Sequence, residues 1–241
     1  MKNTRNETPE RSQPHVPAII SAFLCIAATV LFIFSQALAS RAWADPAYSW
    51  IQQSIRDLGA TTAPLHDLLD KSLIIQGFAV AIAVWAIRPL WRKSVLAIPA
   101  CTMMTLSGIG FVIAGLAPFD AYPSVHMIFG AAPILLFGVF GLIIAGFAVD
   151  NNYFERLWVY TFQLAVVGIV GGFLYFTENY LGTGQGLIER IWVFALLTWF
   201  LIIAGKTLHK ELKLASKILR PRWNRFKLRM MVSMKKPSSS P

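Results

Sequence analysis

The chain has 241 residues, of which 56% are hydrophobic and only 14% are charged, and its mean hydropathy is +0.55. Soluble globular domains carry roughly a quarter charged residues, so this composition excludes an ordinary soluble protein and indicates one that needs lipid. The net charge of +10 collects beside apolar stretches and not in a basic domain with interleaved aromatic residues, so we expect no nucleic-acid partner. Cys25 and Cys101 fall within apolar stretches and are expected to act as small hydrophobic residues.

Apolar stretches predict the architecture, because crossing the hydrocarbon core takes about 20 predominantly apolar residues. Six stretches meet this requirement, approximately Val16–Ala39, Leu73–Leu90, Ser94–Ala117, Val125–Val149, Leu157–Thr177 and Ile191–Leu208. The sequence therefore predicts an all-α integral membrane bundle of six transmembrane helices. A polar tail (residues 1–15) precedes the membrane domain (residues 16–208), and a basic tail (residues 209–241) follows it.

The distribution of Lys and Arg predicts the orientation, since cationic segments resist translocation. With the N-terminus inside, the cytoplasmic segments hold 18 of these residues, and the outer segments hold four, namely Arg41, Arg56, Lys71 and Arg190. We therefore expect both termini in the cytoplasm and a multi-pass protein of the cell membrane.

The first stretch has a second interpretation, because Ala42-Trp43-Ala44 resembles a small-x-small signal cleavage site. Its apolar part is longer than a usual signal sequence, which favours a retained span. Cleavage would remove one helix and leave the other five unchanged.

Residues inside the spans indicate how the helices meet. Glycines recur at helical spacing, for example Gly168 and Gly172, and such small residues let helices approach closely. The amides of Gln76 and Gln163 need partners in hydrocarbon, so we expect them to join neighbouring helices.

Polar side chains that could carry chemistry lie in the segments predicted to be outer. These segments are the long connection over residues 40–72, the Pro-bracketed turn over residues 115–126 and the start of the last span at residues 186–190. The candidate ligand-binding residues are Ser54, Asp57, His66, Asp120, His126, Glu189 and Arg190. Because they share a depth in the membrane, we predict that Asp57, Asp120, His126 and the Glu189-Arg190 pair converge on one outward-facing cavity.

Each candidate also has a structural interpretation. Ser54 and Asp57 are residue types that cap helices or form turns. His66 and Asp70 lie four residues apart, but Asp67 and Lys71 have the same spacing and form an ordinary ion pair, which favours a structural role for this segment.

The remaining candidates divide in the same way. Glu189 and Arg190 suit a boundary pair that holds the last helix. Asp120 follows a proline in a turn and could be only solvated. His126 enters an apolar span, where ionisable groups tend to be paired or functional. We favour Asp120 and His126 as site residues.

Three pieces of sequence carry a resemblance to a known family. They are Ser54-Ile55-Arg56-Asp57-Leu58-Gly59-Ala60, Gly115-Leu116-Ala117-Pro118-Phe119-Asp120 followed by His126, and Gly186-Leu187-Ile188-Glu189-Arg190. With them, residues 16–208 resemble the bacterial and archaeal membrane proteins of the domain-of-unknown-function family numbered 998. The resemblance implies a compact multi-helix domain with these pieces on one side, and it implies no settled activity, substrate or cofactor. Arg56 stands where a smaller polar residue is expected, which argues against a site role for it.

These observations favour a non-catalytic membrane module that binds a lipid headgroup, a small solute or a partner at its outer face. The alternative is an intramembrane hydrolase or lipid-modifying enzyme that uses the outer His, Asp and Glu side chains. The histidines lack an HxxxH or HExxH spacing, so no metal site is predicted. A transporter would show broken helices and repeated halves, and neither pattern is visible. Catalytic residues, cofactor and protein partners stay open.

The C-terminal tail shows a helical charge pattern. Lys206, Lys210, Lys213, Lys217 and Arg220 step by four and three residues and share one helical face, while Leu208, Leu212, Ala215 and Leu219 share the opposite one. We expect an amphipathic helix that Pro221 interrupts, and that binds anionic lipids of the inner leaflet.

Overall fold

The computed structural model describes residues 13–91, 94–148, 153–154 and 156–234, with side chains described as far as residue 218. The helices are α1 (Val16–Ala42), α2 (Ile55–Leu58), α3 (His66–Ile87), the 3-10 turn η1 (Arg88–Leu90), α4 (Ala97–Leu116), α5 (Pro123–Val125), the π-helix η2 (His126–Ala131), α6 (Ala132–Ala148), α7 (Leu157–Phe176) and α8 (Gln185–Met234). Over these residues the only β-pairing is an isolated bridge between Ala44 and Ala47.

These segments make six helical spans that are long and apolar enough to cross a membrane, with α3 and η1 forming one span and α5, η2 and α6 forming another. This confirms the predicted six-helix architecture. Two of them begin earlier than their apolar stretches suggest. The second span, α3, starts at His66 and not at Leu73, and the last span, α8, starts at Gln185 and not at Ile191. In both cases polar residues form the first turns of the span, so side chains that looked like loop residues belong to helices of the bundle.

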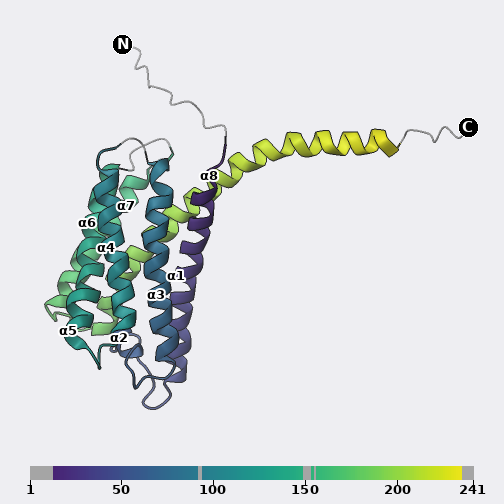
Figure 1. The fold of residues 1–241 in the computed structure, drawn as a ribbon. Helices are drawn as coiled ribbons and strands as arrows, with labels where there is room; N and C mark the ends of the chain where they lie inside the picture. Colours follow the sequence, from purple (N-terminus) through teal and green to yellow (C-terminus); the bar gives the residue numbers. More distant parts are fainter. Residues whose placement is uncertain (1–12, 92–93, 149–152, 155, 235–241) are drawn as a thin grey trace, which may run out of the picture.

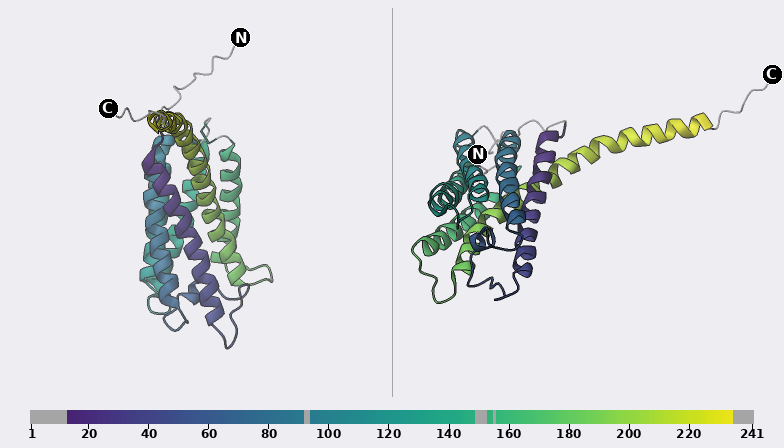
Figure 2. Two further views of the ribbon diagram at one scale, coloured as in Figure 1. Left: turned by 90° about the vertical axis from the view of Figure 1, so that its right-hand side faces the viewer. Right: turned by 60° about the horizontal axis from the view of Figure 1, so that its bottom comes forward.

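The spans pack around α8 (Figures 1 and 2). In chain order α1 contacts α3, α3 contacts α4, α4 contacts α6, and α6 contacts α7, while α8 packs against both α1 and α7. The apolar part of α8 is 67% buried, against 33% to 50% for the other spans. The last helix therefore closes the bundle by packing between the first span, α1, and the span before it in the chain, α7.

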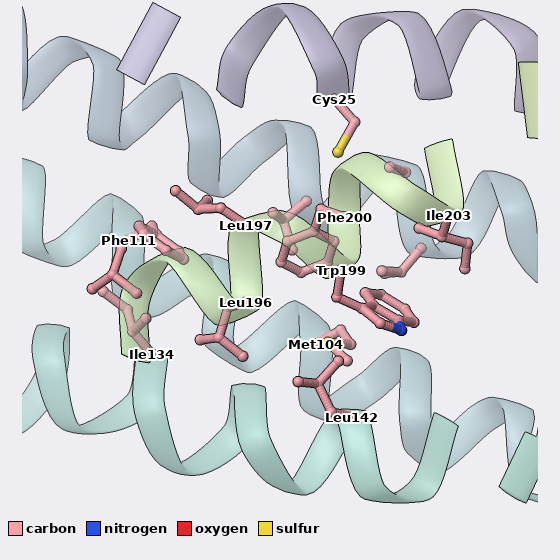
Figure 3. Packing of buried hydrophobic residues seen from close by; sticks show 14 of the residues in the cluster. Cys25, Met104, Phe111, Ile134, Leu142, Leu196, Leu197, Trp199, Phe200 and Ile203 are labelled. Atoms are coloured by element: carbon pink, nitrogen blue, oxygen red, sulfur yellow. The ribbon is translucent and has the colours of Figure 1, made fainter. Parts of the chain in front are cut away.

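Large apolar side chains fill the space around α8 (Figure 3). Trp199 and Phe200 of α8 are buried with Met104 of α4 and Leu142 of α6. The ring of Trp91 meets that of Trp199 edge to face at a centroid distance of 6.5 Å.

Glycines set the closest helix contacts. A Cβ added to Gly77 of α3 would lie 2.3 Å from the carbonyl oxygen of Gly108 in α4, and a Cβ on Gly108 would lie 2.7 Å from the Gly77 oxygen. A Cβ on Gly172 would lie 2.3 Å from Leu135. The expected close approach at small residues is present, and the α3–α4 contact is made by backbone against backbone.

The two span glutamines do not behave as expected. Gln163 is exposed on α7, and Gln76 is fully buried without a hydrogen-bond partner among the described residues. Gln36 of α1 is in the same state. The spacing of apolar residues locates a span, but it does not determine what a buried amide meets.

The expected interruption at Pro221 is wrong, because α8 continues as one helix to Met234. A proline in a helix loses one backbone hydrogen bond and crowds the preceding turn. The helix has already left the bundle there (Figure 1), so water or lipid headgroups can donate a hydrogen bond to the backbone carbonyl that loses its partner.

We predict that Gly77→Ala destabilises the bundle, because the new methyl group would overlap the Gly108 carbonyl oxygen. Overpacking typically costs about 1–3 kcal/mol. The matched control is Gly205→Ala, since a Cβ there meets nothing within 4 Å. Thermal unfolding in detergent should show a lower midpoint for the first variant only; equal midpoints would contradict a tight α3–α4 contact.

Six spans place the start of α1 and the exit of α8 at the same end of the bundle (Figure 1), and the cation distribution predicts that this end is cytoplasmic. A cysteine at the exposed Thr183 should react with an impermeant reagent in intact cells, and one at the exposed Ser216 should react only after lysis. Ser54 is fully buried and is unsuitable as a probe. The reverse labelling pattern would overturn the orientation.

Candidate functional site

One end of the bundle carries the connections at residues 43–65, 117–122 and 177–184, and we call it the loop end. The opposite end, where α8 leaves, is the basic end. The connection between α1 and α3 contains α2 and folds back over the bundle at the loop end (Figures 1 and 2). Its position is set by two neighbouring residues of α8, Glu189 and Arg190.

Arg190 fixes the first part of this connection. It is 5% exposed, and its Nη1 donates to the carbonyl oxygens of Trp50 at 2.9 Å, Gln53 at 3.0 Å and Gly186 at 3.0 Å. Its Nη2 donates to the hydroxyl of Tyr48 at 2.7 Å, and its guanidinium lies 4.6 Å from the centre of the Trp50 ring. A guanidinium with its donors directed at carbonyls and its face on an indole holds the chain in place, so Arg190 has a structural role.

Tyr48 completes this arrangement. Its hydroxyl donates to the carbonyl oxygens of Gln53 and Ser54, at 2.9 and 2.7 Å. Burial raises the pKa of Tyr48 to about 12, against the opposing effect of the nearby Arg190 charge. The phenol therefore stays protonated at physiological pH and continues to donate.

Glu189 fixes the second part of the connection. Its side chain is 7% exposed, and its Oε2 accepts a hydrogen bond from the backbone N–H of Ile55 at the start of α2. Asp57 acts within α2 itself, because its Oδ2 accepts from the Ser54 backbone N–H at 2.7 Å. Ser54 and Asp57 thus sit at the beginning of α2, as their structural interpretation expects.

Beneath α2 lies a cavity of about 40 Å³ within the bundle. A cavity of this size has room for a few water molecules. Most of its walls are apolar, but four ionisable side chains line it, and they come from the 43–65 connection, α3, η2 and α8. These four are Arg56, Asp70, His126 and Glu189.

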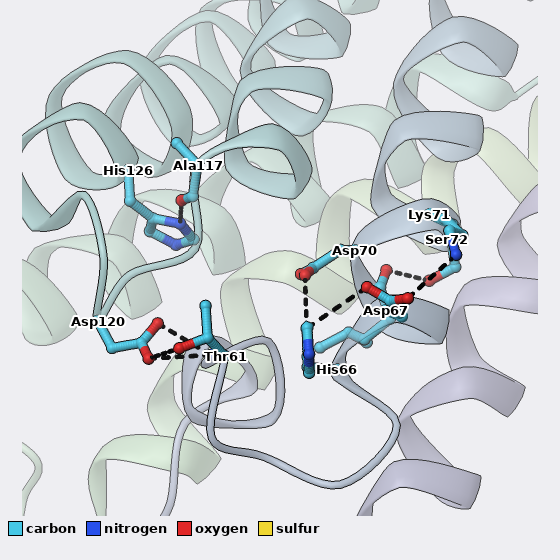
Figure 4. A network of polar contacts seen from close by, with 10 residues as sticks. Thr61, His66, Asp67, Asp70, Lys71, Ser72, Ala117, Asp120 and His126 are labelled. Atoms are coloured by element: carbon cyan, nitrogen blue, oxygen red, sulfur yellow. Dashed lines mark hydrogen bonds and ion pairs between the residues drawn. The ribbon is translucent and has the colours of Figure 1, made fainter.

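His126 lies in the first turn of the π-helix η2 and is 8% exposed. Its Nδ1 lies 2.8 Å from the carbonyl oxygen of Ala117 (Figure 4). A carbonyl can only accept, so Nδ1 carries a proton, and in the neutral ring Nε2 is left as an acceptor. Gly130 lets η2 approach α4 closely, with an added Cβ only 3.1 Å from Ala114.

Arg56 is held against aromatic and sulfur groups. Its guanidinium lies 4.1 Å from the centre of the Phe119 ring, and its Nη1 lies 3.7 Å from the sulfur of Met127. Its Nε is 4.0 Å from Asp57 Oδ1 and is buried with no hydrogen-bond partner in the part of the chain that the structure describes. The sequence argued against a site role for Arg56, whereas the structure places it at the cavity wall.

Asp70 lies about one turn after the start of α3 and is 8% exposed. Its Oδ2 is 3.4 Å from His66 Nδ1 (Figure 4). The Asp67–Lys71 pair beside it, at 3.3 Å, is exposed and ordinary, as its spacing predicts. The four-residue spacing of His66 and Asp70 is the sequence feature that links Asp70 to the site, although the ion pair beside it favours a structural role for the segment.

Asp120 lies away from the cavity on the surface of the loop end. Its carboxylate accepts from the Thr61 backbone N–H at 3.0 and 2.9 Å and from the Thr61 hydroxyl at 2.5 Å (Figure 4). These hydrogen bonds lower its pKa. Asp120 therefore joins the α4–α5 turn to the 43–65 connection.

The candidates thus separate into two groups. His126 and Glu189 line the cavity together, while Asp57, Asp120 and Arg190 hold the surrounding chain segments. The expected convergence holds for two candidates and is wrong for those three. No group of three His, Cys, Asp or Glu side chains among the described residues is arranged to hold a metal ion.

All four cavity residues lie in the part of the chain that matches a family model. Residues 26–206 match the family described as "Protein of unknown function (DUF998)". The chain belongs to this family. The match covers the bundle from within α1 to the apolar part of α8 and confirms the resemblance seen in the sequence, so the cavity lies within the family's domain and most of the α8 extension lies outside it. No curated protein and no solved structure matches the chain.

We predict that Arg190→Lys loosens the 48–53 segment, because an ammonium cannot reach the same four acceptors or stack as a guanidinium does. Each hydrogen bond to a charged group contributes about 1.5–3 kcal/mol. Hydrogen exchange of the full-length protein in nanodiscs should show faster exchange in residues 46–56. The control Lys71→Ala, in an exposed ion pair, should leave this segment unchanged; unchanged exchange in both variants would refute the anchoring role.

Proposed function

We propose that this multi-pass membrane protein is a non-catalytic module that binds a small cation of the ammonium type in the loop-end cavity. The observation that carries the proposal is the state of Glu189. Its carboxyl group lies inside a span at the cavity wall. None of the ion pairs within 4 Å among the described residues joins it to an arginine or lysine.

The two nearby arginines are occupied elsewhere. Arg190 directs its Nη1 and Nη2 to three carbonyls and a phenol, and Arg56 stacks on Phe119 beside Asp57. A carboxylate inside a bundle is stable only when a proton or a partner neutralises it. The cavity is where such a partner would reach Glu189.

The other walls suit a donor of hydrogen bonds. Asp70 supplies a second carboxyl group, and the neutral ring of His126 supplies an acceptor nitrogen. A small ammonium ion has several N–H groups and a positive charge, so it matches two acids and an imidazole. A lipid headgroup or an ester substrate does not fit a volume of about 40 Å³, since ligand pockets for drug-sized molecules measure roughly 300–1,000 Å³. The volume favours a small solute over the lipid-modifying alternative.

The cation distribution supports a location in the cell membrane with the loop end outside. The cavity would then sample solutes from the outer side, through the 43–65 connection that covers it.

The test is a titration of the full-length protein in nanodiscs with ammonium and methylammonium, monitored by thermal unfolding. Ligand that binds only the folded state raises its stability with concentration. We expect a rise for both cations, no rise with tetramethylammonium, and loss of the effect in Glu189→Gln. The control Asp67→Asn alters an exposed acid outside the cavity and should retain it.

Three outcomes would overturn the proposal. The first is an equal rise for all salts, and the second is an unchanged rise in Glu189→Gln. The third is a dependence of stability on pH through Glu189 with no response to ammonium, which would make the proton the only occupant. Turnover of added lipid esters that requires His126 would replace the binding function by the enzymatic one.

A further inference from the structure

The second half of α8 extends well past the bundle. The helix has 50 residues, so at 1.5 Å per residue it is about 75 Å long, whereas the hydrocarbon core is about 30 Å thick. Figures 1 and 2 show the helix leaving at the basic end and running sideways, across the direction of the spans. This is the direction in which a membrane surface would extend.

Glu211 fixes the point of departure. It is 1% exposed, its Oε2 accepts from the backbone N–H of His15 at 2.6 Å, and its Oε1 accepts from the hydroxyl of Tyr153 at 2.9 Å. It therefore ties α8 to the residue before α1 and to a residue that precedes α7. The neighbouring Lys210 lies with its Nζ 5.1 Å from the centre of the Tyr153 ring.

An apolar stripe runs along the extension. Leu208, Leu212 and Ala215 begin it, and Leu212 is 53% exposed, so the bundle does not cover it. Because the helix continues past Pro221, positions 219, 223, 226, 230 and 234 fall on the same face by helical register, and they are Leu, Trp, Phe, Met and Met. The steps are four or three residues throughout, which gives one continuous stripe.

Cationic residues accompany the stripe. Residues 206–234 contain nine Lys or Arg and one acidic residue, Glu211, which is buried at the junction. Lys213 and Lys217 are exposed on the face opposite the stripe. By register, positions 222, 225 and 229, all Arg, fall toward one edge of the stripe, and position 227, a Lys, toward the other.

We propose that residues 212–234, beyond the junction at Glu211, form a helix that lies in the plane of an anionic membrane surface at the basic end, with the apolar stripe against the acyl chains. Such helices bury their apolar face about 5–10 Å into the headgroup boundary, and anionic lipids strengthen the contact. The charge pattern favours an anionic membrane surface as the partner of this helix. Pairing of two such helices along the stripe would bring two strongly basic segments together, and an RNA partner would leave the stripe exposed. The inference does not depend on the proposed cation site.

The test uses the full-length protein with Cys25 and Cys101 replaced by alanine and one nitroxide label. Labels at Leu212 or Ala215 report the stripe, and a label at Lys217 reports the opposite face. In nanodiscs that contain phosphatidylglycerol, the stripe labels should be accessible to oxygen and shielded from a water-soluble nickel chelate, while the Lys217 label should show the reverse. In purely zwitterionic nanodiscs, or at high salt, the contrast between the faces should fall several-fold.

A charge variant sharpens the test. Lys213→Gln combined with Arg220→Gln and Arg225→Gln should reduce the contrast in anionic nanodiscs, whereas Lys71→Gln at the loop end should not. Stripe labels that stay open to the nickel chelate in anionic nanodiscs would show a solvated tail. Shielding from both reagents, with crosslinks between copies, would show helix pairing. Equal contrast in anionic and zwitterionic nanodiscs would remove the electrostatic part of the proposal.

Discussion

The burial of one guanidinium on the last span organises the loop end. Arg190 is surrounded by carbonyl oxygens, a phenol and an indole, and this set of acceptors makes a charge tolerable at that depth. In return, the 48–53 segment cannot leave α8 without exposing an unpaired charge to an apolar surrounding. Glu189, the residue before Arg190, accepts a hydrogen bond from the Ile55 backbone N–H and so holds the start of α2. Two consecutive positions on one helix therefore place the cover of the cavity.

Close backbone contacts place its walls. Gly77 and Gly108 bring α3 against α4, and a Cβ on Gly115 would lie 2.4 Å from the carbonyl oxygen of Asp70. On the other side of α4, Gly130 brings η2 close to Ala114. Asp70 and His126 therefore reach the same cavity because small residues of α4, Gly115 and Ala114, let α3 and η2 approach it closely from both sides. Larger residues at these positions would move the two side chains apart without touching either of them.

The molecule has opposite electrical characters at its two ends. Side chains at the loop end are mixed in sign and largely engaged with backbone groups, as the contacts of Asp57, Asp120 and Arg190 show. The basic end carries the strongly cationic extension of α8, attached through Glu211. A bundle with a small acid-lined cavity near one surface and a basic amphipathic helix along the other is suited to sense solutes on one side while staying associated with lipid on the other. This combination follows from the two proposals and is tested through them.

The number of spans, their approximate limits and the charge asymmetry were readable in the sequence, because lipid imposes a minimum apolar length and translocation disfavours cations. The family was also readable, from short motifs at the loop end. The i, i+4 rules similarly predicted the Asp67–Lys71 pair. These features depend on composition and local spacing, which a single chain displays directly.

The cavity was decided by the tertiary structure. Residues at equal depth can face different neighbours, so depth alone grouped Asp120 and Arg190 with His126. The family pattern argued against Arg56, and the ordinary Asp67–Lys71 spacing argued against Asp70, although both line the cavity. Which of them meet depends on how α3, α4 and α8 rotate about their axes, and the glycine contacts and the Arg190 hydrogen bonds fix those rotations. The continuity of α8 through Pro221 also depends on where the helix lies in the structure. Local propensity predicts a break, but the helix is already outside the bundle, where an unpaired carbonyl can be solvated.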